Sequence, residues 1–313
     1  MTKRVLVGDS LSPEGLALFE KAGYQVDVKL NLSASELAAI IGDYDALVAR
    51  SKPKVPAEVF ANPGKLKVVG RAGIGVDNID GKAARAKEIA VMNTPGGNTV
   101  TTAEHAIALM FSLARHIPRG TASLKAGRWE KNKLEGIELF NKTLGVVGLG
   151  QVGKIVADRA LGLKMKVIGF DPYVSEADMA KLGVEAVDLD ALLARADVIT
   201  IHTPKTAATT NLIDSAAFEK MKPGALLINA ARGGIVDETA LAAALESGRL
   251  GGAALDVFVN EPPGDHPLLR FENLIATPHL GASTFDAQVN VAIQVAEQII
   301  EFLDHGVARN VVN

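Results

Sequence analysis

The chain lacks cysteine entirely and has few aromatic residues. Without a thiol it can form no disulfide bond, no thiolate metal site and no cysteine nucleophile. Aromatic residues make up 4% of the chain and Trp129 is the only tryptophan, which argues against a stacking platform for single-stranded nucleic acid. No apolar run reaches the roughly 18 residues that a membrane-spanning helix needs.

Excess charge of one sign is also absent. A net charge of −3 offers no basic surface to nucleic acid or to anionic lipid. The first residues, MTKRVLVGDS, predict a strand and a turn rather than a signal peptide. Together with the missing cysteines, these features predict a cytoplasmic globular protein that binds neither nucleic acid nor membrane.

The pattern of the chain predicts an α/β protein. Its 313 residues, 48% of them hydrophobic, exceed the usual size of one domain. Short β-rich runs alternate with helical patterns, which is typical of βαβ units and parallel sheets. We predict strands at 4–7, 25–28, 46–49, 66–69, 143–147, 166–170, 197–201, 225–229, 252–256 and 274–278. These form two series, so we expect two doubly wound parallel-sheet domains with a cleft between them.

Capping signals mark several of the helices. Ser33 and Glu36 fit a capping box, and so do Thr101 and Glu104 at the start of a helix over 102–117. The body of that helix, AIALMFSLA, is apolar nearly all round, which predicts burial on more than one side and favours a homodimer or a higher homo-oligomer. A last helix over 284–303 follows Ser283 as its cap and ends at Gly306.

The sequence Gly148-Leu149-Gly150-Gln151-Val152-Gly153 has the spacing GxGxxG. Such glycines often serve chain geometry alone, but here a predicted strand precedes them and a predicted helix follows. Asp171 ends the next strand, 18 residues after Gly153, where an acid that binds the adenosine ribose is expected. No arginine follows Asp171 to balance a 2′-phosphate. The motif therefore predicts a Rossmann domain that binds NAD rather than NADP.

Three loops at the ends of predicted strands carry residues suited to hydride transfer with a hydroxy acid. That chemistry needs a group that exchanges a proton near neutral pH, which suits His279, and a cation for the carboxylate, which suits Arg232. Glu261 follows a neighbouring strand. Taken singly, each has a plain alternative: a structural histidine, an ion-paired loop arginine and a solvated loop acid. Their shared edge of one sheet favours a common site. Gly233 and Gly234 are expected to leave space for a ligand beside Arg232.

Five motifs in order, VVGRAGIGVDNID, GLGQVG, NAARGGIVDE, ALDVFVNEPP and TPHLGAST, resemble those of the D-2-hydroxyacid dehydrogenases over essentially the whole chain. The resemblance implies that Arg232 binds the substrate carboxylate, that His279 exchanges the hydroxyl proton, and that Glu261 binds His279 and favours its protonated form. It implies contacts with NAD at Ile74, Gly148, Gly150, Gln151, Val152, Gly153, Asp171, Thr203, Ala230, Ala231, Arg232, Asp256, His279, Gly281 and Ala282. It implies substrate contacts at Gly73, Ile74, Arg232 and His279.

Within that family the motifs are most similar to members that oxidise D-3-phosphoglycerate, in the first step of serine biosynthesis. A phosphorylated substrate needs further cations. As a contact to the phosphate, Arg50 with Ser51 is a better candidate than the basic segment around Trp129. The basic segment around Trp129 resembles a subunit-contact region, or is a solvated loop. Alternatives are another acid of the glyoxylate, hydroxypyruvate or lactate type, and a scaffold that senses NAD without catalysis. No spacing of metal ligands is present.

The two series of predicted strands, with the functions that the resemblance implies, predict a domain organisation. Residues 1–96 are expected to form the substrate-binding domain, 97–282 the NAD-binding domain, and 283–313 a helix that returns to the first domain. Because the sequence ends at VARNVVN, shortly after this helix, we expect no feedback by serine through a C-terminal regulatory domain.

Overall fold

The computed structural model describes residues 2–313, which divide into two compact units. Unit 1 comprises the chain up to Thr99 together with Ala282–Asn313, and unit 2 comprises Val100–Gly281. Each unit is built on a single parallel sheet, so the α/β class with two doubly wound sheets is confirmed. No helix within residues 2–313 is long and apolar enough to cross a membrane.

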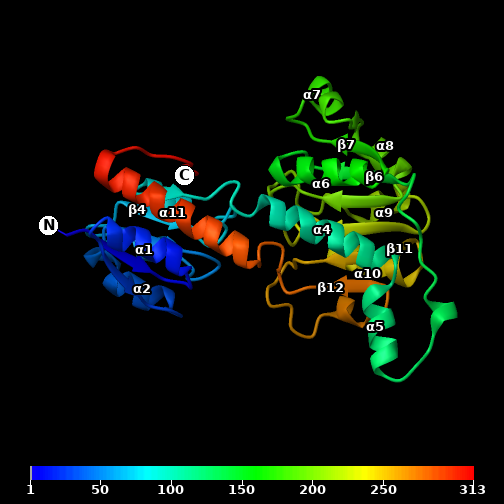
Figure 1. Ribbon diagram of the computed structural model, residues 1–313, viewed down its shortest axis with the longest axis horizontal. Helices are drawn as coiled ribbons and strands as arrows, with labels where there is room; N and C mark the ends of the chain where they lie inside the picture. Colours follow the sequence, from blue (N-terminus) through cyan, green and yellow to red (C-terminus); the bar gives the residue numbers. More distant parts are fainter. Residues whose placement is uncertain (1) are drawn as a thin grey trace. The chain divides into compact units, whose positions relative to one another are not determined.

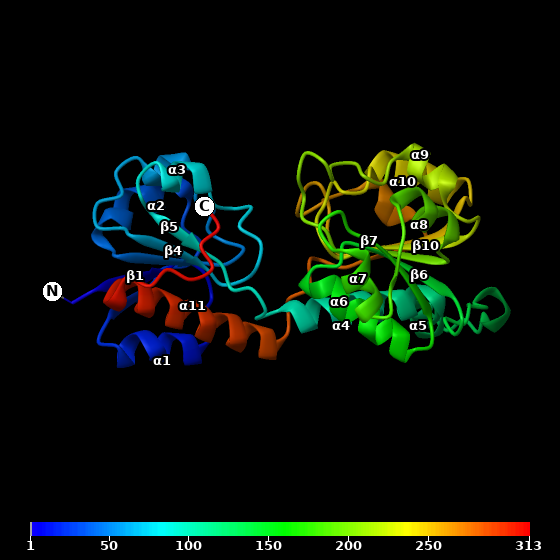
Figure 2. The same ribbon diagram turned by 90° about the horizontal axis from the view of Figure 1, so that it is seen from above.

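Unit 1 contains a five-stranded sheet in the order β2-β1-β3-β4-β5. The strands are β1 (Arg4–Val7), β2 (Gln25–Val28), β3 (Ala46–Ala49), β4 (Val68–Arg71) and β5 (Ala90–Met92). The helices are α1 (Pro13–Lys21), α2 (Ala34–Ile40), α3 (Gly81–Arg85) and α11 (Phe285–His305), with 3-10 turns η1 (Ile41–Asp43) and η2 (Ala57–Phe60). Figure 2 shows α1 and α11 on one face of the sheet and α2 and α3 on the other. Two apolar layers, one on each face, form the core.

Unit 2 contains a seven-stranded sheet in the order β12-β11-β10-β9-β6-β7-β8 (Figure 1). The strands are β6 (Thr143–Val147), β7 (Lys166–Phe170), β8 (Glu185–Ala186), β9 (Val198–Ile201), β10 (Ala225–Asn229), β11 (Leu250–Leu255) and β12 (Leu274–Ala276). The helices are α4 (Thr99–Ala114), α5 (Ile117–Lys125), α6 (Gln151–Gly162), α7 (Glu176–Lys181), α8 (Leu189–Arg195), α9 (Ser215–Lys220) and α10 (Glu238–Glu246), with η3 (Lys131–Lys133) and η4 (Pro267–Arg270). The strand order reverses between β6 and β9, and ligands bind at such a switch point in open α/β sheets.

The structure corrects both ends of the helix predicted over 102–117. Helix α4 begins at Thr99, so Thr101 lies inside it and is not its cap. The helix ends at Ala114, and His116 then takes a φ of 52° before Pro118 in the first turn of α5. Proline cannot donate a hydrogen bond to the preceding turn, and the Ala114 carbonyl instead accepts from Ile137 N–H at 2.9 Å.

Helix α11 is capped by Thr284, not by Ser283, because the Thr284 hydroxyl accepts from Ala287 N–H. The Ser33–Glu36 capping box and the left-handed end at Gly306 are confirmed. The predicted strand over 66–69 lies two residues later, at Val68–Arg71, since pairing with β3 starts at Val68. The short strands β5 and β8 were not predicted from the sequence.

Candidate active site

The loop after β6 contains three glycines, and a side chain would be excluded at two of them for different reasons. Gly148 has a φ of 92°, and a Cβ there would lie 2.8 Å from the His202 carbonyl oxygen. A Cβ on Gly153 would overlap the Gly148 carbonyl, so α6 can pack against the sheet only with glycine at this position. A Cβ on Gly150 would meet no atom within 4 Å. The loop is therefore open to an approaching ligand at Gly150 alone.

The first turn of α6 lies beside that opening. Gly150 is its N-cap and provides no side chain to accept from the helix N–H groups, and Gln151 and Val152 form the first turn. Free N–H groups and the positive end of the helix dipole favour an anion such as a pyrophosphate. The Thr203 hydroxyl oxygen is buried and has no hydrogen-bond partner among residues 2–313, while its methyl group lies against Gly148. Both observations fit a dinucleotide.

Asp171 lies at the end of β7 and is tied to the glycine loop. Its Oδ2 accepts from Leu149 N–H at 2.8 Å, and its Oδ1 accepts from Tyr173 N–H at 2.8 Å. A carboxylate has about four acceptor positions, so it can also accept from the hydroxyls of a ribose. The next residues are Pro172 and Tyr173, neither of which is a cation. The local charge therefore opposes a 2′-phosphate.

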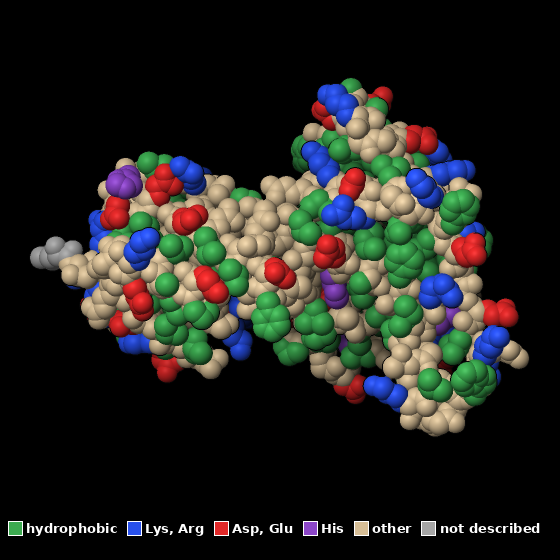
Figure 3. All heavy atoms as spheres, in the orientation of Figure 1, with side chains coloured by type: hydrophobic (Ala, Val, Ile, Leu, Met, Phe, Trp, Pro, Cys, Tyr) green, Lys and Arg blue, Asp and Glu red, His purple; other side chains and the backbone are tan. Residues whose placement is uncertain are grey.

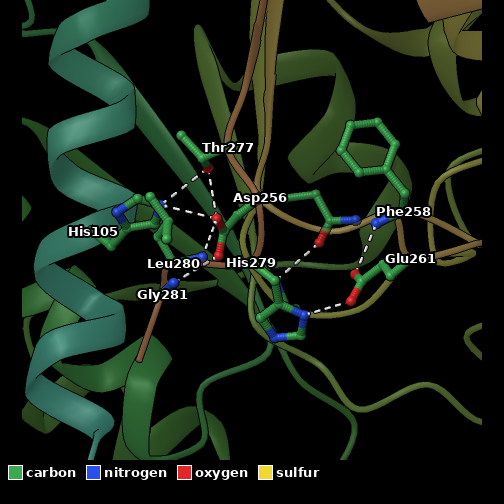
Figure 4. Close-up of polar contacts among 10 residues, drawn as sticks. His105, Asp256, Phe258, Glu261, Thr277, His279, Leu280 and Gly281 are labelled. Atoms are coloured by element: carbon green, nitrogen blue, oxygen red, sulfur yellow. Dashed lines mark hydrogen bonds and ion pairs between the residues drawn. The ribbon is translucent and has the colours of Figure 1, made fainter. Parts of the chain in front are cut away.

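His279 follows β12 and Glu261 follows β11, on the β9 side of the switch point. Figure 4 shows the two side chains as a hydrogen-bonded pair. His279 Nδ1 lies 2.7 Å from Glu261 Oε2, and Glu261 Oε1 accepts from Phe258 N–H at 3.1 Å. The side chains remain 49% and 37% exposed, so a small molecule can reach them. The hydrogen bond that His279 donates to Glu261 raises the pKa of His279, although burial and the charge of Arg232 oppose it. Burial works against ionisation of Glu261, but the hydrogen bonds that it accepts outweigh burial and lower its pKa.

Arg232 lies in the loop after β10, and its charge acts on His279. The buried Asn229 holds this loop, because its amide donates to the Arg232 carbonyl at 3.0 Å and its Oδ1 accepts from Ala231 N–H at 3.0 Å. Arg232 Nη1 donates to the Ala231 carbonyl at 2.7 Å. A guanidinium carries several N–H donors in a planar fork, a geometry that matches a carboxylate.

The glycines after Arg232 do not leave space for a ligand, contrary to expectation. A Cβ on Gly233 would overlap the backbone of Phe258, and one on Gly234 would lie 2.7 Å from Lys205 Nζ. Gly233 therefore lets the arginine loop pack directly on the loop that carries Glu261. The two loops are brought together by this backbone contact.

Asp256 follows β11 and is 1% exposed. It accepts from the Thr277 hydroxyl at 2.6 Å and from the N–H groups of Leu280 and Gly281 at 2.7 and 2.8 Å. His105 of α4 also contacts it, with Nε2 at 3.2 Å from Oδ1. Sequence reasoning missed this role of His105, because its partner lies 151 positions away and its own surroundings predict only a helix.

The other predicted residues are distributed over both units. Ala230 and Ala231 follow β10, and Gly281 and Ala282 follow His279. In unit 1, Arg50 follows β3 and donates from Nη1 to Ser10 Oγ at 3.1 Å, and the next residue, Ser51, is exposed.

Gly73 and Ile74 follow β4, the strand next to β3. The Gly73 N–H donates to Thr94 Oγ1 at 2.7 Å, so it is not available to a substrate carboxylate. The Ile74 carbonyl accepts from the Asn93 amide at 2.8 Å. Of the two residues, only Ile74 can provide a substrate N–H contact in this arrangement.

His202 is a structural residue. Its Nε2 lies 2.8 Å from Thr200 Oγ1, and burial lowers its pKa to about 4, so it is neutral at physiological pH. Among residues 2–313 no group of three or more carboxylate and imidazole side chains could hold a metal ion.

These features together describe a dinucleotide-dependent dehydrogenase: an open glycine loop at a helix N-terminus, a ribose-binding acid, and a histidine paired with a carboxylate beside an arginine. Residues 107–281 match the family model described as "D-isomer specific 2-hydroxyacid dehydrogenase, NAD binding domain". The chain belongs to the D-isomer specific 2-hydroxyacid dehydrogenases, as its motifs predicted, and its cofactor is NAD.

Similar proteins support this membership. A D-3-phosphoglycerate dehydrogenase of Archaeoglobus fulgidus is 50% identical over 99% of this chain and 59% of its own length. A crystal structure of a Thermus thermophilus protein has a TM-score of 0.91 at 35% identity and covers 99% of this chain and 100% of its own. A glyoxylate reductase structure from Paecilomyes thermophila has a TM-score of 0.90 at 28% identity, covering 99% and 98%. The chain thus spans under two thirds of the curated relative's length.

Proposed function

We propose that the protein oxidises D-3-phosphoglycerate to 3-phosphohydroxypyruvate with NAD. The observation that carries the chemistry is the 2.7 Å contact between His279 and Glu261 next to the charge of Arg232. The choice of substrate is supported by the 50% identity to a D-3-phosphoglycerate dehydrogenase. It is also supported by Arg50, a cation at the carboxyl edge of the sheet of unit 1.

The residues divide the reaction among them. Bound NAD, held by the glycine loop and Asp171, would supply the acceptor for the hydride that leaves the carbon bearing the hydroxyl group. Arg232 binds the substrate carboxylate, and neutral His279 takes the hydroxyl proton on Nε2, because Nδ1 faces Glu261. Glu261 stabilises the imidazolium that results. In the reverse direction, protonated His279 returns the proton to the oxygen of the ketone.

Each unit has its own part in this proposal. Unit 2 binds NAD through Gly150, Asp171 and Thr203, with its glycine loop at the switch point. The carboxylate of Asp256, from which the resemblance implies a further contact, is 1% exposed and accepts its hydrogen bonds from within the protein. Unit 1 contributes to substrate binding through Arg50 and Ile74 on the loops after β3 and β4. The helix α11 belongs to unit 1, where it packs on α1.

Purified protein should form NADH from NAD and D-3-phosphoglycerate, and do so faster than with glycolate, lactate or glycerate. NADP in place of NAD should support far less turnover, because Asp171 repels a 2′-phosphate. Preference for glycolate or lactate would keep the mechanism and discard the substrate. Binding of NAD without turnover of any acid would favour a sensing scaffold.

Replacing Arg50 with alanine should lower kcat/KM for D-3-phosphoglycerate by roughly 10- to 100-fold, the cost of losing a charge-assisted hydrogen bond. Activity on unphosphorylated D-glycerate should change by less than about twofold. The matched control is Arg85→Ala, an exposed arginine of the same unit. Equal losses on both substrates would contradict a phosphate contact at Arg50.

We also propose that the protein forms a homodimer through the α4–α5 side of unit 2. Val100 of α4, Ile117 and Leu124 of α5, and Trp129 shortly after α5 are between 48% and 82% exposed. Figure 3 shows hydrophobic side chains over this region. We take these exposed apolar side chains as the surface that a second copy of the chain would cover, since large exposed apolar patches mark interaction sites.

Sedimentation should give twice the chain mass of 32.8 kDa. Trp129→Glu should shift the equilibrium to the monomer, whereas Val28→Glu, which changes an apolar residue of unit 1 that is 50% exposed, should not. A wild-type monomer at micromolar concentration would contradict this proposal.

A further inference from the structure

The carboxylate of Asp256 lies at the centre of a network that joins α4 to the loop of His279 (Figure 4). Its Oδ1 accepts from the Thr277 hydroxyl at 2.6 Å and from Leu280 N–H at 2.7 Å, and its Oδ2 accepts from Gly281 N–H at 2.8 Å. His105 Nε2 lies 3.2 Å from the same Oδ1. A carboxylate that is 1% exposed has little access to water and depends on these donors.

The network fixes which ring nitrogen of His105 carries a proton. Burial works against ionisation of Asp256, but the hydrogen bonds that it accepts, led by that from His105, outweigh burial and lower its pKa. Asp256 is therefore an acceptor only. The Thr277 hydroxyl directs its proton to Asp256, and its oxygen lies 3.3 Å from His105 Nε2. Both neighbours of Nε2 accept, so Nε2 is protonated and donates.

Asp256 also holds the backbone of the catalytic loop. Its carbonyl oxygen accepts from His279 N–H at 2.9 Å, so three successive N–H groups, from His279 to Gly281, bind one residue. His279 has a φ of 53°, a left-handed conformation that is costly for a residue with a side chain. The contacts with Asp256 hold that conformation, which sets the direction of the imidazole toward Glu261.

We propose that His105 is a positioning residue for His279: by donating from Nε2 to Asp256, it anchors the turn over 279–281 to helix α4. His105 does not touch the reacting atoms and acts only through Asp256. The expected effect of His105 on catalysis rests on the proposed function. The anchoring of the turn over 279–281 to α4 does not depend on it.

The test compares His105→Phe, which fills the space without a donor, with His105→Gln, which keeps an N–H donor. With His105→Phe, kcat for D-3-phosphoglycerate should fall about 10- to 100-fold, the effect of a small displacement of a catalytic group. KM for NAD should change by less than about threefold. His105→Gln should recover most of kcat. His116→Gln is the control, since that histidine lies at the start of α5 and contacts the Glu135 carbonyl.

A second measurement does not depend on turnover. NMR titration of the His279 ring, assigned with His279→Gln, reports its pKa directly. The charged groups that face His279 are Glu261, Asp256 and Arg232. A loosened turn weakens the contact with Glu261, so the pKa of His279 should fall toward its ordinary value in His105→Phe and return in His105→Gln. Thr277→Val removes another donor to Asp256, so it should also lower the pKa of His279.

The outcomes separate the two proposals. An unchanged His279 titration in both His105→Phe and Thr277→Val would overturn the positioning role, and so would a His105→Gln variant as impaired as His105→Phe. Wild-type protein that oxidises no hydroxy acid would remove the proposed function, and the titration would still decide the role of His105. Circular dichroism of His105→Phe tests whether the variant folds, and Thr277→Val takes its place in the titration if it does not.

Discussion

Replacing His279 with glutamine is expected to lower kcat for the oxidation of D-3-phosphoglycerate by about 10²- to 10⁴-fold, the range typical of lost general acid–base groups. Glutamine approximates the size of the ring and can donate a hydrogen bond to Glu261, but it cannot accept the hydroxyl proton. NAD binding, measured by fluorescence of bound NADH, should change by less than about threefold. The loss should therefore appear in kcat and not in the affinity for the cofactor.

The pH dependence identifies the same group. Oxidation needs neutral His279, so activity rises as the pH passes through the pKa of His279. The hydrogen bond that His279 donates to Glu261 raises that pKa, which places the midpoint above the ordinary value of about 6.5. Reduction of the ketone needs the protonated ring, so the rate of reduction should fall as the pH rises through the pKa of His279. The midpoint should be lost in His279→Gln.

Glu261→Gln is the matched variant, because it keeps the shape of the pair and removes the charge. The midpoint for oxidation should move down toward the ordinary pKa of histidine, with a smaller fall in kcat than in His279→Gln. His116→Gln should leave the profile unchanged. A midpoint that stays in place in Glu261→Gln would show that the 2.7 Å contact does not set the titration of His279.

The sequence predicts those parts of the fold whose signals are local. The Ser33–Glu36 capping box lies within four residues, and the glycine loop combines a strand, a turn and a helix start within about one βαβ unit. Apolar strands such as β6 and β10 were placed correctly, because complete burial gives a continuous apolar run. The strands β5 and β8 have only three and two residues, too few to mark a strand in the sequence, and were missed.

The details that depend on distant contacts could not be predicted. His105 and Asp256 are 151 positions apart, and only the packing of α4 on the sheet of unit 2 brings them to 3.2 Å. The sequence predicts space for a ligand beside Gly233, but the backbone of Phe258 occupies that space. The residue types near the chemistry were visible in the sequence, whereas the contacts that orient them belong to the tertiary structure.

Replacing Arg232 with alanine is expected to lower kcat/KM by roughly 30- to 4,000-fold, since removal of a hydrogen-bonded charge from a site costs about 2–5 kcal/mol and each 1.4 kcal/mol is about tenfold. Arg232→Lys should recover only about tenfold of this, because lysine keeps the charge but lacks the two-pronged geometry that matches a carboxylate. Steady-state kinetics with varied substrate measures both effects. Arg195→Ala is the control, since that arginine pairs with Glu185 at the surface.

The pH profile separates Arg232 from a merely structural arginine. The charge of Arg232 lowers the pKa of His279, so its removal should move the midpoint for oxidation to higher pH, opposite to the shift in Glu261→Gln. Arg232→Lys retains the charge and should leave the midpoint near the wild-type value. A loss of activity with no shift in Arg232→Ala would indicate that the guanidinium does not face His279 during the reaction. Opposite shifts in the two variants would show that the charges of Arg232 and Glu261 both act on the imidazole that exchanges the proton.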